Sequence, residues 1–265
     1  NKLDDLRTGE LGTRFNLTLN PSSQEGNFDV GIRAEGNGVS PHDRDIKLTV
    51  DRSGPTSSGM KIWPRATQLY KDGSAKARIA WSVGDNLTGV AAANLQRRFG
   101  NGTKWYNVAG SGRTKAVALL KNGQKNAFRV RATDGAGNTR WNPSMGAKLR
   151  VRDSASSKWT VSSEWKTATT SKAYKGSLLQ AKGATGSITG YFEGRAVAIA
   201  APIGPNRGKF EVRVDGGAWE TVSLKSSSAM HRKIVWSKTV DWKMHTIEIR
   251  GVSRQSAFDA LLWIR

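Results

Sequence analysis

Tryptophans in short polar segments are the side chains in this sequence that are best suited to recognise a ligand. The chain holds 10 tryptophans in 265 residues, and an exposed indole ring offers a flat apolar face on which the C–H face of a sugar can stack. An amide or guanidinium group nearby would supply polar contacts. The candidate carbohydrate-binding residues are therefore Trp165, Trp219, Trp242, Asn206 and Arg207. The alternative for each tryptophan is a structural role, in which the ring closes the open end of a β-sandwich.

Basic residues that alternate with apolar ones form a second candidate site. The net charge is +21, and residues 54–153 hold 18 Lys and Arg against 4 Asp and Glu. If the apolar positions within 128–132 and 149–151 face a core, the basic residues between them face outward on two paired strands. The resulting ladder of candidate polyanion-binding residues is Arg129, Arg131, Lys148, Arg150 and Arg152. The alternative is that these side chains extend into solvent and only increase solubility.

The patterns for nucleophilic catalysis and nucleotide binding are incomplete. A catalytic triad needs a positioned imidazole, and His42, His231 and His245 accompany no G-x-S-x-G motif. We expect His245 to point into the core, because it shares strand parity with two later isoleucines. The glycine-flanked loop at 204–208 is one residue too short for a phosphate-binding loop and leads into an alternating strand. We assign no catalytic residue and expect that this chain is not an enzyme.

The acidic residues of the C-terminal part form no recognisable catalytic pair. A glycosidase needs two carboxylates that face each other across a cleft, and the spacing of the 8 Asp and Glu residues within 154–265 places no two of them in that way. Asp215 precedes two glycines and is expected in a tight turn with positive φ. Asp259 alternates outward beside Phe258, and we expect it to bond to a loop.

Metal ligands are few. The chain has no cysteine, so disulfides and thiolate sites are excluded, and no ligand cluster suits zinc. Oxygen ligands for calcium occur in two turns, which contain Asp85 with Asn86 and Asp134 with Asn138. Neither turn fits the twelve-residue calcium loop, and turns capped by their own side chains account for both. We expect no cofactor, and calcium is the remaining alternative.

The elements that must position these residues are predicted to be β-strands. No stretch of a dozen residues sustains helical spacing of apolar positions, whereas alternation with period two recurs throughout. The segments 51–59 and 153–158 are rich in Ser, Gly or Pro and predict linkers. We therefore predict an all-β protein in which an immunoglobulin-like sandwich (54–153) is followed by a jelly-roll sandwich (154–265) and preceded by a partial β-sandwich piece (1–53).

Alternation also predicts which residues face the cores. The first piece offers Phe15, Leu17, Leu19, Phe28, Val30, Ile32, Ile46, Leu48 and Val50. These strands are too few to bury a core alone, so we expect the upstream part of the same protein or a neighbouring subunit to complete them. The inward positions of the second piece are Ile79, Trp81, Leu95, Tyr106, Val108, Val117, Leu119, Phe128, Val130, Ala132, Leu149 and Val151. The third piece has eight or more such strands, among them the one with Phe210, Val212 and Val214.

Two parts of the sequence resemble known families. Residues 75–151, through "ARIAWSVGDNLTGVAAANLQRR" and "NAFRVRATDGAGNTRW", resemble fibronectin type III and bacterial immunoglobulin-like repeats. The third piece, through "SITGYFEGRAVAIAAPIGPNRGKFEVRVDGGAWETVSL", "HTIEIRG" and "FDALLW", is similar to the galactose-binding-like, carbohydrate-binding jelly-roll modules of secreted bacterial proteins. The resemblance implies scaffold repeats followed by a carbohydrate-binding module.

This resemblance implies the non-catalytic C-terminal modules of a larger secreted or cell-surface bacterial protein. Their expected partner is a polysaccharide or an anionic cell-wall polymer. One alternative is an accessory domain of a secreted hydrolase, such as a subtilisin-like peptidase or a glycosidase; another is a structural subunit of a surface layer or filament. No nucleic-acid-binding module is recognised, so nucleic acid is not an expected partner. The longest apolar run, residues 196–203, is too short to span a membrane.

Overall fold

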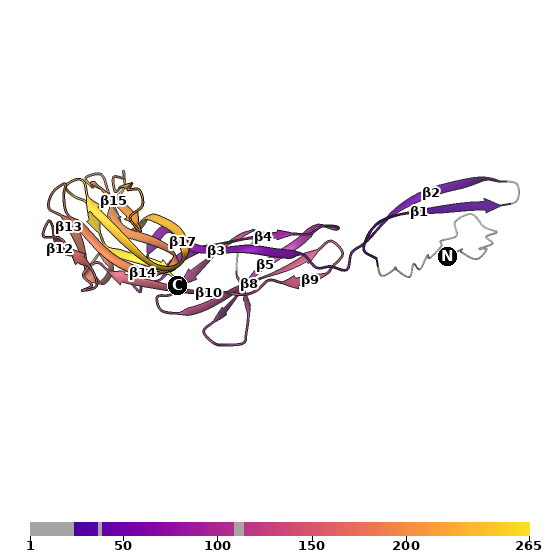
Figure 1. Ribbon diagram of the computed structural model, residues 1–265, viewed down its shortest axis with the longest axis horizontal. Helices are drawn as coiled ribbons and strands as arrows, with labels where there is room; N and C mark the ends of the chain where they lie inside the picture. Colours follow the sequence, from indigo (N-terminus) through magenta and orange to yellow (C-terminus); the bar gives the residue numbers. More distant parts are fainter. Residues whose placement is uncertain (1–23, 37–38, 109–113) are drawn as a thin grey trace. The chain divides into compact units, whose positions relative to one another are not determined.

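The computed structural model describes residues 24–36, 39–108 and 114–265 and divides the chain into two units, residues 1–53 and 54–265 (Figure 1). Regular structure in the described residues is β throughout, apart from one short 3-10 turn at Tyr174–Gly176. The prediction of an all-β protein is therefore confirmed. None of the helical structure in these ranges is long and apolar enough to cross a membrane.

The described part of the first unit is a hairpin of two antiparallel strands, β1 (Gly26–Gly36) and β2 (Val39–Val50). Phe28 pairs with Leu48 and Val30 pairs with Ile46, so the predicted alternation brings apolar residues together across the two strands. Ile46 is 47% exposed. The predicted strand face at 15–19 lies outside the described residues. A two-stranded hairpin is marginally stable by itself, and the need for a completing partner stays a prediction.

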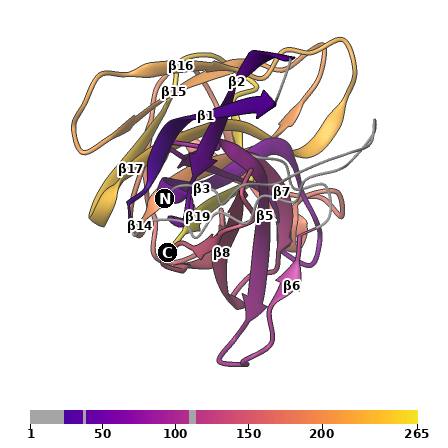
Figure 2. The same ribbon diagram turned by 90° about the vertical axis from the view of Figure 1, so that its right-hand side faces the viewer.

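The described residues of the second unit form 17 strands, and most of these strands belong to one large sheet. Up to residue 153 the strands are β3 (Thr56–Leu69), β4 (Ala75–Gly84), β5 (Val90–Phe99), β6 (Tyr106–Asn107), β7 (Lys115–Leu120), β8 (Lys125–Asp134), β9 (Thr139–Trp141) and β10 (Met145–Asp153). In Figure 2, β5 lies between its hydrogen-bonded neighbours β6 and β8.

The later strands continue the same sheet and add a small one. They are β11 (Thr160–Val161), β12 (Trp165–Thr169), β13 (Ser177–Ala181), β14 (Ser187–Ile203), β15 (Lys209–Val214), β16 (Glu220–Ser223), β17 (Met230–Gly251), β18 (Ala257–Phe258) and β19 (Ala260–Ile264). The large sheet runs in the order β6-β5-β8-β10-β19-β14-β17-β3-β4-β7, and β12, β13 and β18 form the three-stranded sheet. Because β10 pairs with both β8 and β19, the two predicted sandwiches share this sheet.

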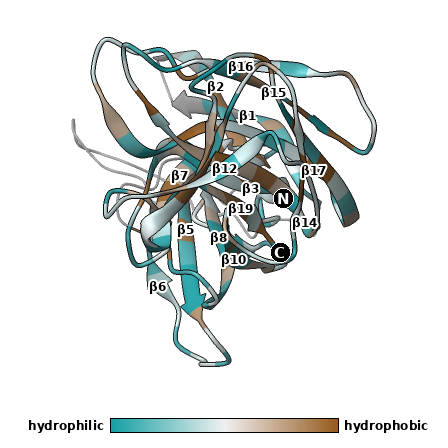
Figure 3. Cartoon of the chain, turned by 90° about the vertical axis from the view of Figure 1, so that its left-hand side faces the viewer, coloured by the Kyte–Doolittle hydropathy of each residue, from teal (hydrophilic) through white to brown (hydrophobic). Residues whose placement is uncertain are grey.

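Two hydrophobic cores lie on opposite faces of β14 and β19. Ala196, Ala198 and Ala200 belong to the first core, whereas Val197 and Ile199 between them belong to the second. Strand β19 alternates in the same way. Strands that are buried on both faces have nearly continuous apolar sequences, which accounts for the apolar run at 196–203. The apolar segments gather in the interior strands (brown in Figure 3).

Two of the predicted core faces of the second piece are wrong. Leu119 is 42% exposed, and the buried face of β7 is Ala116, Ala118 and Leu120 instead. Residues directly opposite each other on paired strands lie on the same face of a sheet. Ala116 pairs with the buried Ile79 of β4, so the partner strand determines which face of β7 is buried. Tyr106, which was also expected to face inward, is 46% exposed.

The hairpin between β15 and β16 confirms the predicted turn. Asp215 and Gly216 have φ of 53° and 68°, the left-handed conformation that such a turn requires. Phe210 and Val212 are fully buried, and Val214 is 8% exposed. The loop at 204–208 connects two strands, so the strand-to-helix geometry of a phosphate-binding loop is not formed.

Candidate functional site

A groove of about 760 Å³ runs over strands β10, β14 and β19 and the loop after β10. We call it the basic groove. Five cationic side chains line it: Arg150, Arg152, Lys158, Lys175 and Arg265. Its two carboxylates are Asp153 and Glu193, and Glu193 is already neutralised by Arg265 at 2.6 Å. The groove therefore carries an excess of positive charge and attracts anions.

Apolar side chains interrupt the charged lining of the basic groove. Tyr191 is 59% exposed and Met244 is 60% exposed, and Trp263 lies beside them. A flat ring flanked by cations can contact the apolar face of a sugar while the cations bind its acidic substituents. This combination suits an acidic sugar polymer better than a small inorganic ion.

Arg152 is fixed within the wall of the groove. Its guanidinium lies 5.0 Å from the ring centre of Trp159 and 5.2 Å from that of Trp263. Burial lowers the pKa of Arg152. One of its terminal nitrogens, Nη1, is buried and has no hydrogen-bond partner within the described parts of the chain. Arg152 therefore keeps an unused donor in the groove wall.

The structure divides the predicted ladder of five cations into two groups. Strands β8 and β10 pair antiparallel only from Met145 opposite Phe128 to Lys148 opposite Lys125. Arg129 lies beyond this pairing, between Trp141 at 3.7 Å and Trp105 at 4.2 Å. Arg131 lies on the same strand, 5.6 Å from Trp141.

The other group, on β10, takes part in the basic groove. Arg150 and Arg152 line the groove, and Lys148 lies next to them on the strand. The alternation of apolar and basic residues along one strand could not predict that Lys158, Lys175 and Arg265 line the same groove, because these three residues lie outside β10. The role of all five predicted residues in polyanion binding stays a prediction.

The predicted carbohydrate-binding residues lie in different environments. Trp165 is 5% exposed and belongs to the second core. Trp219 is half-buried, with the guanidiniums of Arg213 and Arg250 over its ring at 4.4 and 4.2 Å. A sugar would therefore compete with these two cations for contact with the ring of Trp219.

The remaining members of that group are more accessible. Asn206 is exposed and Arg207 is half-buried in the loop between β14 and β15. Burial lowers the pKa of Arg207. Trp242 is 47% exposed, and the guanidinium of Arg195 lies 4.8 Å from its ring centre. None of the five predicted residues lines the basic groove, and their carbohydrate contacts stay predictions.

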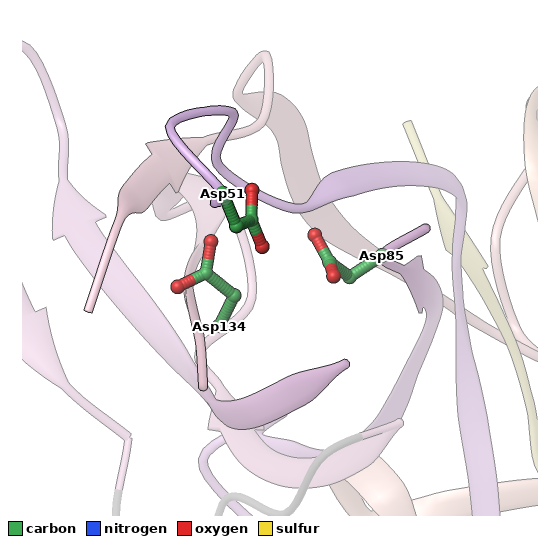
Figure 4. Close-up of side chains that lie close together, drawn as sticks. All are labelled: Asp51, Asp85 and Asp134. Atoms are coloured by element: carbon green, nitrogen blue, oxygen red, sulfur yellow. The ribbon is translucent and has the colours of Figure 1, made fainter. Parts of the chain in front are cut away.

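The two predicted calcium turns pack together as capped turns. Asp85 Oδ2 accepts hydrogen bonds from the backbone of Leu87 and Gly89, at 3.1 and 2.8 Å. Asp134 accepts the backbone N–H of Asn138 at 2.8 Å. One carboxylate oxygen of Asp85 lies within 4.8 Å of one of Asp134 (Figure 4). These acidic groups could hold a metal ion, and calcium binding stays a prediction.

His245 is a core residue, as predicted. It is 2% exposed, its ring stacks on Phe192 at 5.0 Å, and its Nδ1 lies 2.7 Å from Asp215 Oδ2. Its Nε2 lies 2.7 Å from the carbonyl oxygen of Asp241. The ring therefore links the β15–β16 turn to strand β17.

Asp259 corrects one prediction and agrees with another. It does not face outward, because it is only 1% exposed between the two cores. It does bond to a loop, since its Oδ1 accepts the backbone N–H of Tyr174 at 2.9 Å. Burial raises the pKa of Asp259 to about 7.

Comparisons with known proteins give no family. No protein-family model and no curated protein matches the sequence. Solved structures with partial likeness include a family two carbohydrate esterase from Cellvibrio japonicus, at 14% identity over 44% of this chain and 34% of that chain, with a TM-score of 0.32. The chain thus spans about a third of the length of that esterase.

Two further structures cover more of the chain. An exo-β-1,3-galactanase from Phanerochaete chrysosporium, with galactose, matches at 12% identity over 80% of this chain and 69% of that chain, with a TM-score of 0.36. A structure of carbohydrate-binding modules from the β-sandwich superfamily matches at 12% identity over 81% of this chain and 97% of that chain, with a TM-score of 0.28. Likeness at these TM-scores assigns no function, which must be argued from the residues of this chain.

Proposed function

We propose that the basic groove binds an acidic polysaccharide and that the chain acts by adhesion, without catalysing a reaction. The observation that supports this most directly is the groove itself, which is lined by five cations together with the exposed Tyr191. In this role the chain would hold the protein that carries it, outside the cell or at its surface, close to an anionic polymer. Binding would be reversible and would weaken with salt, because each neutralised charge releases a counterion.

The test is calorimetry with the whole chain and two sets of polymers. Acidic polymers (polygalacturonate, heparin and teichoic acid) should bind, and neutral cellulose and galactan should bind much more weakly. The double variant Arg150→Gln/Lys158→Gln should lose affinity roughly tenfold, because two exposed charge pairs contribute up to about 1 kcal/mol each. It should also flatten the dependence of affinity on salt. Tyr191→Ala should weaken binding of the polymer at every salt concentration.

The matched control is Lys166→Gln/Lys225→Gln, which removes two exposed cations that do not line the groove. It should leave the affinity almost unchanged. Equal losses in both double variants would show that only the net charge matters, and binding of neutral polymers as tight as that of acidic ones would contradict the proposal.

A second candidate function is hydrolysis of the polymer in the same groove. Burial raises the pKa of Asp153, and Asp153 lines the groove together with Glu193. A glycosidase uses one carboxyl group with a raised pKa and one ionised carboxylate. Release of new reducing ends from a bound acidic polymer, abolished by Asp153→Asn, would favour hydrolysis over adhesion. Adhesion without hydrolysis predicts no such release.

A further inference from the structure

A second hollow of about 420 Å³ lies where strands β8, β10, β14 and β17 and the end of β5 converge. We call it the cationic pocket. Its charged and aromatic lining residues are Arg98, Lys125, Lys148, Arg195, Trp242 and Arg265. Among the residues that the structure describes, no Asp or Glu side chain lines it. Arg265 also lines the basic groove, so the two hollows adjoin at this residue.

Most cations of this pocket lack a partner of opposite charge within the described part of the chain. Of the five, only Arg265 has an ion pair in the described residues, with Glu193. The Nε atoms of Arg98 and Arg195 are buried and have no hydrogen-bond partner in the same ranges. The pKa of Lys148 is lowered, first by the positive charge of Arg150 and then by burial and by the charges of Lys125 and Arg265. The positive charges therefore act on one another in this pocket. Leaving buried donors unpaired is costly, and an anion bound by these two guanidiniums would reduce that cost.

A bulge in β17 presents the aromatic side of the pocket. Gly194 pairs with Lys243 and Ala196 pairs with Thr239, so extra residues of β17, Trp242 among them, stand opposite Arg195 alone. Bulges of this kind redirect a side chain, often beside a functional site. His245 holds the bulge in shape, because its Nε2 lies 2.7 Å from the carbonyl oxygen of Asp241.

The arrangement of donors selects the type of anion. The cations lie on four different strands and directly after β19, so they approach a central ligand from several directions. A phosphate or sulfate ester presents three terminal oxygens in a tetrahedron, whereas a carboxylate presents two in one plane. The exposed face of Trp242 lies beside these donors and suits the apolar face of a sugar ring.

We propose that the cationic pocket binds a sugar unit that carries a phosphate or sulfate ester. The ester occupies the space between Arg98, Lys148 and Arg195, and the sugar ring contacts Trp242. That this sugar unit belongs to a polysaccharide rests on the proposed function of the adjoining groove. Binding of the ester in the cationic pocket does not rest on it. A polymer with such esters would reach both hollows across Arg265.

The experiment is a titration of the whole chain, followed by NMR or calorimetry, with small probes. The probes are glucose 6-phosphate, glucose 6-sulfate, glucuronate, glucose and inorganic phosphate. We expect one of the two esters to bind at least tenfold more tightly than glucuronate, and glucose not to bind. The ester with the lower Kd distinguishes a phosphorylated source from a sulfated one.

Variants place the binding in this pocket. Arg195→Gln and Lys148→Gln should each weaken ester binding roughly tenfold, as loss of one charge-assisted contact implies. Lys148 is half-exposed, so its variant keeps the test valid if Arg195→Gln unfolds. Trp242→Ala should lower the affinity for the ester to that for inorganic phosphate. The matched controls are Lys166→Gln and Trp141→Ala, the latter because Trp141 is 41% exposed but lies outside the pocket.

The outcomes separate this site from the basic groove. Ester binding that survives Tyr191→Ala supports the pocket even if the acidic polymers fail to bind, which would overturn the proposed function alone. Equal affinity for glucuronate and the esters overturns the pocket, as does unchanged ester binding in both the Arg195 and Lys148 variants. Tighter binding of a single-stranded oligonucleotide than of either ester, lost in Arg195→Gln, would also overturn it by making the pocket a nucleic-acid contact.

Discussion

Replacing Asp259 with asparagine is expected to stabilise the protein at alkaline pH by about 4 kcal/mol and to leave its stability near pH 4 unchanged. Burial raises the pKa of Asp259 from 3.8 to about 7, and the charge of Asp153 adds to the shift. The folded state therefore binds the proton more firmly than the unfolded state does. The stability that the protonated group provides is complete below pH 3.8 and is lost as pH rises through 7. Asparagine resembles the protonated acid and still accepts the N–H of Tyr174.

Urea unfolding of both proteins at pH 4, 6 and 8.5 measures this effect. The difference in the free energy of unfolding between variant and wild type should grow steadily with pH. Asp241→Asn, in an exposed part of β17, is the control for replacing a carboxyl group with an amide. A constant difference across the three pH values for Asp259→Asn would show that this carboxyl group ionises in the folded state as it does in water.

Replacing Gly194 with alanine is expected to destabilise the protein by about 3 kcal/mol, the upper part of the usual range for overpacking. A Cβ atom at this position would overlap the carbonyl oxygen of Ile264 and lie 3.0 Å from its carbonyl carbon, and Trp263 Cδ1 would be 3.2 Å away. The first two atoms are backbone of β19, which cannot move without disturbing both cores. The variant should also weaken polymer binding, because Trp263 and Arg265 line the groove.

Gly84→Ala is the matched control for this substitution. Gly84 also lies in a strand, and a Cβ atom there would meet no atom within 4 Å. Thermal and urea unfolding should show almost no change for Gly84→Ala and a clear loss for Gly194→Ala. Similar losses in both variants would mean that alanine is unfavourable for the strand backbone itself, and that the approach of β14 to β19 is not the cause.

Alternation in the sequence predicted strands well and predicted the direction of side chains only where one face is buried. It placed Phe128 and Val130 correctly, because β8 has a single core face. It failed for Asp259, since the stretch that contains it lies between two cores and has no outward face. It failed for Leu119 because the pairing of β7 with β4, rather than the size of the side chains, decided which face is buried.

The candidate site was predictable only in fragments. Alternation along β10 predicted that Arg150 and Arg152 face outward. Lys175, in the 3-10 turn, and Arg265, directly after β19, line the same groove and could not be predicted in this way. Such residues are separated in sequence by whole strands, so no local pattern links them. Trp242 was predicted to bind sugar because it lies in a short polar segment, but it lies in a bulge of β17 whose register depends on a distant strand.

The two faces of β14 and β19 tie the halves of the second unit to one another. Each of these strands gives one set of side chains to the first core and the alternate set to the second. Domains that fold independently can be exchanged between genes one at a time, but the two halves of this unit cannot. An exchange of residues 54–153 for a foreign sandwich would leave Ala198 and Leu262 against a surface that did not evolve with them. Recombination would therefore transmit residues 54–265 as one inherited block.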